Sequence, residues 1–173
     1  MKFDTYTSEI ITMGQIDQTM REAGGIDPEK WDVSVDHRNT TRMKEIVESI
    51  GWPTVTKVGA EASHFAWLLV QHADHDVLFQ KKCLNLMNSQ PVTEVRLQEL
   101  AYLEDRVRTN EGRPQLYGTQ FFTDRATNKF GSRPINNLDE LDARRMAVGL
   151  EPFIEYERRM LETYKNRMKL PNS

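Results

Sequence analysis

Hydrophobic residues recur at three- and four-residue steps along most of this chain, a spacing that places them on one face of an α-helix. Residues that can cap a helix precede several of these stretches, and glycine or proline follows several of them. The pattern therefore predicts mostly helical structure. The expected helices cover about residues 7–24, 39–50, 59–87, 93–107, 139–148 and 153–169.

A different pattern lies between the fourth and fifth of these helices. Aromatic residues and threonine flank a polar, turn-rich stretch, with Gln115 to Phe122 on one side and Phe130 to Ser132 on the other. Such an arrangement favours a β-hairpin. The sequence contains neither an internal repeat nor a low-complexity linker. We therefore expect a mainly α fold, a single-domain helical bundle over residues 1–173 with one small β-hairpin.

Polar residues interrupt the apolar faces of three of the expected helices. When the helix at 59–87 is phased by its small apolar residues, Asp76 and Gln80 fall inside the apolar stripe and His72 lies at its margin. Breaking a buried ion pair costs about 3 to 5 kcal/mol, which is a large part of a total stability of roughly 5 to 15 kcal/mol. We therefore expect the misplaced residues to meet around one cavity. They are Asp17, Arg21, His72, Asp76, Gln80 and Arg145.

His72 and Asp76 are the pair in this set with the clearest chemistry. A carboxylate one helical turn from an imidazole can fix its tautomer, so that the second ring nitrogen acts as general base or acid near neutral pH. Arg21 and Arg145 would hold a carboxylate or phosphate, since guanidinium groups match those anions. The leading hypothesis is an enzyme of lyase, cyclase or hydrolase type that acts on a small polar, anionic metabolite. Further contacts to that ligand would come from Tyr117, Thr119 and Gln120.

Two alternatives stay open. The same polar core could only fix the fold of a non-catalytic module that binds a small ligand or a protein partner. A metal ion could bind near His72, because His72 and Asp76 have the i,i+4 spacing that lets two side chains reach one ion. No HExxH sequence or cysteine cluster supports the metal, and the nucleotide-binding patterns GxGxxG and GxxxxGK[ST] are also absent. We therefore expect no metal and no other cofactor.

Composition narrows the class of partner. The chain has 23 Lys and Arg against 26 Asp and Glu, and the resulting net charge of −3 does not favour nucleic acid. The longest apolar run, 65–70, is too short to span a membrane, and the start of the chain lacks the apolar core of a signal peptide. A single cysteine, Cys83, excludes an internal disulfide. We expect a cytoplasmic protein with a small-molecule ligand and with neither nucleic acid nor membrane as partner.

Five short motifs extend the set of candidate residues. They are Asp17-Gln18-Thr19-Met20-Arg21, Gly51-Trp52-Pro53, Gln71-His72-Ala73-Asp74, Asp105-Arg106 and Gln115-Leu116-Tyr117-Gly118-Thr119-Gln120. Over about residues 14–150 this succession resembles a family of small, mostly bacterial proteins classed as domains of unknown function, and the Tyr-Gly-Thr-Gln run is its most specific part. The resemblance implies no established activity. It adds Gln18, Asp105, Arg106 and Gln115 to the candidate site.

Overall fold

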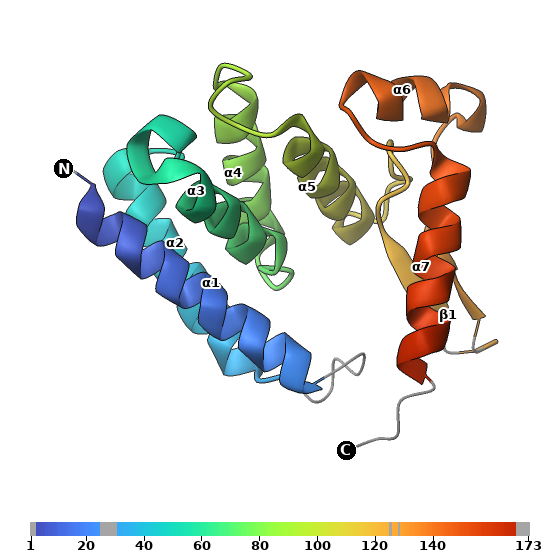
Figure 1. Ribbon diagram of the computed structural model, residues 1–173, viewed down its shortest axis with the longest axis horizontal. Helices are drawn as coiled ribbons and strands as arrows, with labels where there is room; N and C mark the ends of the chain where they lie inside the picture. Colours follow the sequence, from blue (N-terminus) through green and yellow to red (C-terminus); the bar gives the residue numbers. More distant parts are fainter. Residues whose placement is uncertain (1–2, 25–30, 125, 128, 169–173) are drawn as a thin grey trace. The chain divides into compact units, whose positions relative to one another are not determined.

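Helices make up most of the chain (Figure 1). The computed structural model describes residues 3–24, 31–124, 126–127 and 129–168. The chain groups into two compact units, residues 1–103 and residues 104–173. The first unit contains α1 (Asp4–Gly24), α2 (Val33–Ile50), α3 (Val55–Gln71), α4 (Val77–Asn88) and the first half of α5 (Leu97–Asn110). The expectation of a single domain over residues 1–173 stays a prediction.

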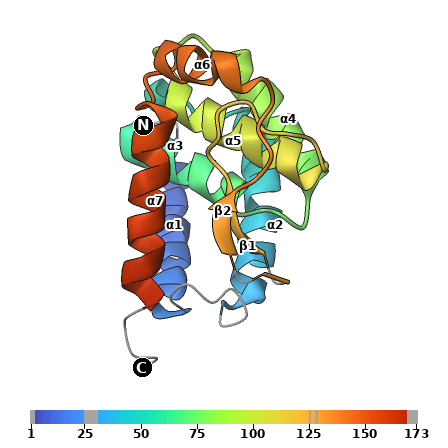
Figure 2. The same ribbon diagram turned by 90° about the vertical axis from the view of Figure 1, so that its right-hand side faces the viewer.

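The second unit contains the β-hairpin. It holds the second half of α5, β1 (Phe121–Asp124), β2 (Lys129–Ser132), the short 3-10 helix η2 (Leu138–Glu140), α6 (Leu141–Ala147) and α7 (Phe153–Met168). β1 and β2 pair antiparallel, with Phe121 opposite Ser132 (Figure 2). The ring of Phe130 in β2 stacks on that of Tyr164 in α7, with 4.3 Å between ring centroids. The expected mainly helical fold with one small hairpin is confirmed.

In the first unit, α1 lies very close to α3 because α1 carries a glycine at the contact. A Cβ atom placed on Gly14 would lie 2.2 Å from Cδ1 of Phe65, so no larger residue fits without movement. Ile10 of α1 and Ala62 and Ala66 of α3 are fully buried. Close approach of the two helices brings polar side chains of α1 within reach of the end of α3.

The expectation of one continuous helix over 59–87 is wrong. α3 ends at Gln71, with the backbone N–H of His72 still bonded to the Leu68 carbonyl, and α4 begins only at Val77. The side chain of Asp76 accepts a hydrogen bond from the Phe79 backbone N–H at 3.0 Å and so caps the N-terminus of α4. Residues 72–76 are therefore a turn, and the single helical phase assumed for them does not apply.

Other helix boundaries also differ from those expected. α1 begins at Asp4, and α2 begins at Val33, capped by Asp32, whose side chain accepts from the backbone N–H of Ser34. α5 starts at Leu97 instead of at a cap on Thr93, which lies in a turn, and α6 starts at Leu141 after the 3-10 turn. The expected end of the last helix at residue 169 lies outside the described residues. Among the helices described, none is long and apolar enough to cross a membrane.

Candidate functional site

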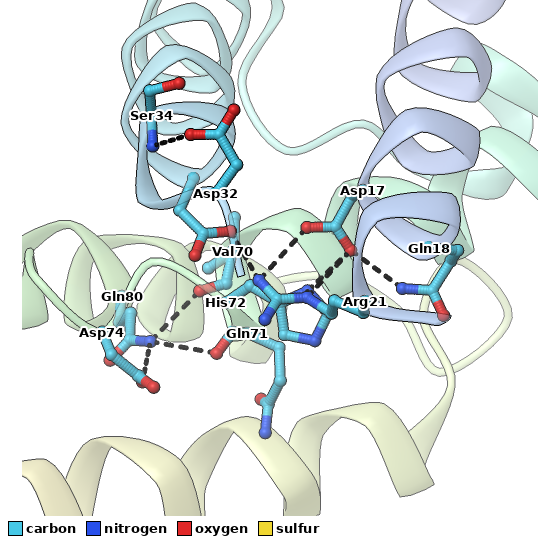
Figure 3. Close-up of polar contacts among 11 residues, drawn as sticks. Asp17, Gln18, Arg21, Asp32, Ser34, Val70, Gln71, His72, Asp74 and Gln80 are labelled. Carbon is cyan, nitrogen blue, oxygen red and sulfur yellow. Dashed lines mark hydrogen bonds and ion pairs between the residues drawn. The ribbon is translucent and has the colours of Figure 1, made fainter. Parts of the chain in front are cut away.

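Four charged or ionisable side chains from α1, α2 and the turn after α3 form a cluster, which we call the histidine cluster: Asp17, Arg21, Asp36 and His72 (Figure 3 shows three of them). The guanidinium of Arg21 donates through Nε and Nη2 to both oxygens of Asp17, at 3.3 and 3.2 Å. Nη2 also donates to Oδ1 of Asp36 at 2.5 Å. Asp17 is fully buried, whereas the other three side chains keep a small exposed fraction of 13 to 16%.

Nδ1 of His72 lies between a hydrogen-bond acceptor and a hydrogen-bond donor. It is 2.9 Å from Oδ2 of Asp17, which can only accept, and 2.9 Å from Nε of Arg21, which can only donate. We assign the proton to Nδ1, because Arg21 Nε then still has Oδ2 of Asp17 as acceptor. The opposite tautomer would set a nitrogen lone pair against a buried carboxylate. In the neutral ring, Nε2 is therefore the unprotonated nitrogen.

Nε2 of His72 makes no hydrogen bond within the described part of the chain, and it is not among the fully buried polar atoms there. This nitrogen therefore keeps some exposed surface. The other ring nitrogen is held by a buried acid. This combination, with one nitrogen fixed and the other open, is the arrangement that a general base or acid needs.

The two acids of the cluster differ in pKa. Burial alone would raise the pKa of Asp17, but the hydrogen bond and charge of His72 and the charge of Arg21 outweigh it, so the pKa lies below its ordinary value. Burial raises the pKa of Asp36 as well, the negative charge of Asp17 adds to this, and Arg21 offsets it only in part. Asp17 therefore stays ionised near neutral pH, and Asp36 takes up a proton at a higher pH than Asp17 does.

Asp76, expected to orient His72, makes other contacts. In addition to capping α4, its carboxylate forms an ion pair with Lys44 of α2. The hydrogen bond from Lys44 is the main cause that lowers the pKa of Asp76. The orienting contact to His72 comes from Asp17 instead, on a helix more than fifty residues away in sequence.

The two candidate glutamines of the first unit have supporting contacts. Gln18 donates from Nε2 to Oδ2 of Asp17 at 2.8 Å and so adds a donor to the buried carboxylate. Gln80 is fully buried, and its Nε2 donates to the carbonyls of Val70 and Gln71, at 3.2 and 3.3 Å. Gln80 thus links α4 to the last turn of α3.

Sequence reasoning missed three residues around the cluster. Asp36 was missed because α2 was expected to begin at Asn39 or Thr40, which left Asp36 outside any helical face. The imidazoles of His37 and His75 lie 3.9 Å apart between ring centroids. Burial and the charge of His37 lower the pKa of His75. An earlier start for α2, capped by Asp32, is the signal that would have placed Asp36 and His37.

The remaining candidates lie in the second unit and support a loop, residues 115–120, which we call the motif loop. Asp105 of α5 is fully buried, and its carboxylate accepts from the backbone N–H groups of Leu116, Tyr117 and Thr119 and from the Thr119 hydroxyl, at 2.6 to 3.2 Å. Burial raises the pKa of Asp105, and these donors oppose the rise. The acid therefore fixes the backbone of the loop.

Two glutamines of the motif loop and an arginine of α6 form further hydrogen bonds that hold the loop. Gln115 accepts from the backbone N–H of Gln120 through Oε1 and donates through Nε2 to the Gln120 carbonyl, at 2.8 and 3.1 Å. Gln120 itself donates to the Thr119 hydroxyl. Arg145, almost fully buried, donates to the carbonyls of Tyr117 and Glu151 at 2.5 and 2.7 Å. These hydrogen bonds, all within the protein, give the motif residues a role in holding the backbone of the loop.

Two more motif residues are Gly118, in the motif loop, and Arg106, in α5. Gly118 has a φ of 69°, and a Cβ atom there would lie 2.7 Å from Cε2 of Phe153, so the position requires glycine. Arg106, one residue after the buried acid, is half-buried, and its backbone carbonyl accepts from the Thr109 hydroxyl at 3.0 Å. The predicted candidates thus fall into two sets in two units, and their meeting around one cavity stays a prediction.

The described residues contain no group of three or more His, Cys, Asp or Glu side chains that could hold a metal ion. A metal ion near His72 therefore stays an alternative without a ligand set of this kind among the described residues.

Comparison with known proteins gives a family but no function. No curated protein and no solved structure matches the chain. One protein-family model does match, and it covers nearly the whole chain, from residue 5 to residue 169, including both the histidine cluster and the motif loop. The chain belongs to this family, which is described as a family of unknown function (DUF6624).

Proposed function

We propose that the chain is an enzyme that applies general acid–base chemistry to a small polar metabolite, with His72 exchanging a proton at Nε2. One observation carries the proposal: Nε2 makes no hydrogen bond to a described residue and is not fully buried, while Nδ1 is hydrogen-bonded to a buried carboxylate. Asp17 is the positioning residue, because it fixes the ring and stabilises the imidazolium that forms when Nε2 takes a proton. Acid–base catalysis of this kind contributes about 10²- to 10⁴-fold in rate.

Two carboxylates, those of Asp17 and Asp36, and the guanidinium of Arg21 are the charged groups of the cluster around His72. The reaction class remains lyase, cyclase or hydrolase, in the cytoplasm. The contacts of Asp76 and Arg145 do not support the roles expected for them, so the proposal assigns no chemistry to either.

A non-catalytic binding module is the second candidate function. The observation that favours it is the motif loop, where the acid and the glutamines named above are satisfied by the protein itself. In such a module the histidine cluster would only hold α1, α2 and the end of α3 together. The two functions differ in what they require of Nε2 of His72.

The tautomer of His72 tests the proposal without knowledge of the substrate. Nitrogen-15 NMR of the full chain at neutral pH should show a protonated Nδ1 and an unprotonated Nε2, and Asp17→Asn should weaken this preference. His72→Gln identifies the signal. A neutral ring with the proton on Nε2 and with Nδ1 accepting from Arg21 would refute the proposed role.

A pair of alanine variants separates enzyme from binding module. His64 is a matched control, because its Nδ1 also contacts a buried acid, Glu99, at 2.7 Å, but its side chain is 38% exposed and outside the cluster. With a panel of small polar metabolites, His72→Ala should abolish turnover at little cost in stability, and His64→Ala should leave turnover unchanged. A large loss of stability in His72→Ala, with no turnover by the unmodified chain, would favour the module.

A further inference from the structure

Arg21 has an edge to which no described residue forms a hydrogen bond. Its Nε and Nη2 donate to Asp17, and Nη2 also donates to Asp36. Nη1, with two N–H groups, makes no hydrogen bond to any residue that the structure describes and is not fully buried. The ring of Trp31 lies over the guanidinium, 4.6 Å from Cζ, so a ligand would meet Arg21 at this edge and not on that face.

Asp36 has a matching oxygen that accepts from no described residue. Its Oδ1 accepts from Arg21, whereas no residue within the described ranges donates to its Oδ2. Nη1 and Oδ2 belong to groups joined by one hydrogen bond, so a donor edge and an acceptor edge lie next to each other. Both are next to His72, because Arg21 also contacts its Nδ1. A ligand at this place meets one cationic and one anionic group beside His72.

The charge of the cluster limits which ligands fit. Two carboxylates face one guanidinium, so with a neutral imidazole the histidine cluster carries a formal charge of −1. A dianion such as sulfate or phosphate on Nη1 would be repelled by Asp36 and by Asp17 behind it. A lone carboxylate would meet the same repulsion. A molecule with a carboxylate and an ammonium group would satisfy both edges.

We infer that the histidine cluster binds an amino-acid-like zwitterion, whose carboxylate accepts from Nη1 of Arg21 and whose ammonium donates to Oδ2 of Asp36, with Asp36 as the residue that sets this specificity. The inference rests on the proposed function, because it names the substrate class of the same site. It retains the expected binding of a carboxylate by Arg21 and adds the requirement for a neighbouring cation.

Binding of four simple probes to the full chain tests the inference. Glycine, acetate, methylammonium and sulfate are titrated while the ring signals of His72 are followed by NMR. Glycine should bind at least about tenfold more tightly than acetate or methylammonium, since it alone meets both charges, and sulfate should bind most weakly. This ranking needs no variant. Equal binding of glycine and acetate, tighter binding of sulfate, or no shift with glycine up to about 0.1 M would overturn the inference.

Asp36→Asn tests the residue itself. The amide removes one negative charge at nearly constant size, so the preference for glycine over acetate should fall to about one, and sulfate should bind about tenfold more tightly than before. Asp32→Asn is the matched control, because Asp32 lies one turn earlier and bonds the backbone of Ser34 at the surface. An unchanged preference in Asp36→Asn, or an equal change in Asp32→Asn, would refute the role of Asp36.

Failure of this inference and failure of the proposed function have different signatures. If His72 shows the assigned tautomer but acetate binds as well as glycine, only the substrate class is wrong. If the tautomer is reversed while glycine still binds with the expected preference, the zwitterion site exists but His72 is not its base.

Discussion

Replacement of Asp105 by asparagine should unfold the motif loop at a large cost in stability. The carboxylate is fully buried and accepts from three backbone N–H groups and one hydroxyl. An amide has one oxygen, so whichever way it is turned at least one of these N–H groups, on Leu116 or Thr119, faces an NH₂ donor. The side chains differ by little in volume, so the change tests hydrogen bonding and charge alone.

The magnitude follows from the number of donors lost. One buried N–H without an acceptor costs about 1 to 3 kcal/mol, and hydrogen bonds to a charged acceptor are worth more than those to a neutral one. We expect Asp105→Asn to lower the free energy of unfolding by about 2 to 4 kcal/mol, a substantial part of a typical total of roughly 5 to 15 kcal/mol. Urea unfolding measures this loss, and amide hydrogen exchange at Leu116, Tyr117 and Thr119 should accelerate with it.

An exposed carboxylate provides the control. Asp124 also accepts two backbone N–H groups, from Ala126 and Thr127 at 2.8 and 3.2 Å, but at the surface, where water can replace them. Asp124→Asn should therefore cost less than about 1 kcal/mol. If Asp105→Asn costs no more than its control, or leaves amide exchange in the motif loop unchanged, Asp105 does not hold the loop as described.

Two further predictions concern the first unit. Gly14→Ala should lower the free energy of unfolding by about 1 to 2 kcal/mol, since the clash with Phe65 outweighs the better helix propensity of alanine. Gln15→Ala, on the exposed side of α1, is the control and should cost almost nothing. A stabilised Gly14→Ala protein would show that α1 and α3 can separate at little cost in free energy. Burial raises the pKa of the Cys83 thiol to about 12. The folded chain should therefore resist a thiol-specific disulfide reagent at pH 8, and the unfolded chain in urea should react fully. Rapid reaction of the native chain would place Cys83 outside the core.

The sequence alone was sufficient for the class of fold. Periodicity predicted the helices and the aromatic stretches predicted the hairpin, because both patterns depend on which residues are buried. Boundaries were harder to place. The sequence does carry a signal for the break between α3 and α4, because an aspartate directly before the apolar run Val77-Leu78-Phe79 is a typical N-cap. The apolar-face pattern instead places Asp76 among the core residues, and this interpretation hides the break.

The site was partly predictable. Asp17, Arg21 and His72 were selected because they break an apolar face, and these three do contact one another. Their pairing could not be predicted, since it depends on α1 packing against α3, and one sequence carries no information on such long-range contacts. For Asp105, the short motif pointed to the residue but not to its role, because a buried acid that binds a ligand and one that binds a loop look the same in sequence.

The contact between Gly14 and Phe65 also sets the positions of the residues in the histidine cluster. Arg21 follows Gly14 by seven positions on α1, and His72, the residue directly after α3, follows Phe65 by seven positions, so the chain advances by about two helical turns in both places from the tight contact to the polar one. Insertion of one residue between Gly14 and Asp17 would rotate the acid by about 100° and leave the tight contact in place. The length of this segment is therefore as much a part of the site as the side chains themselves.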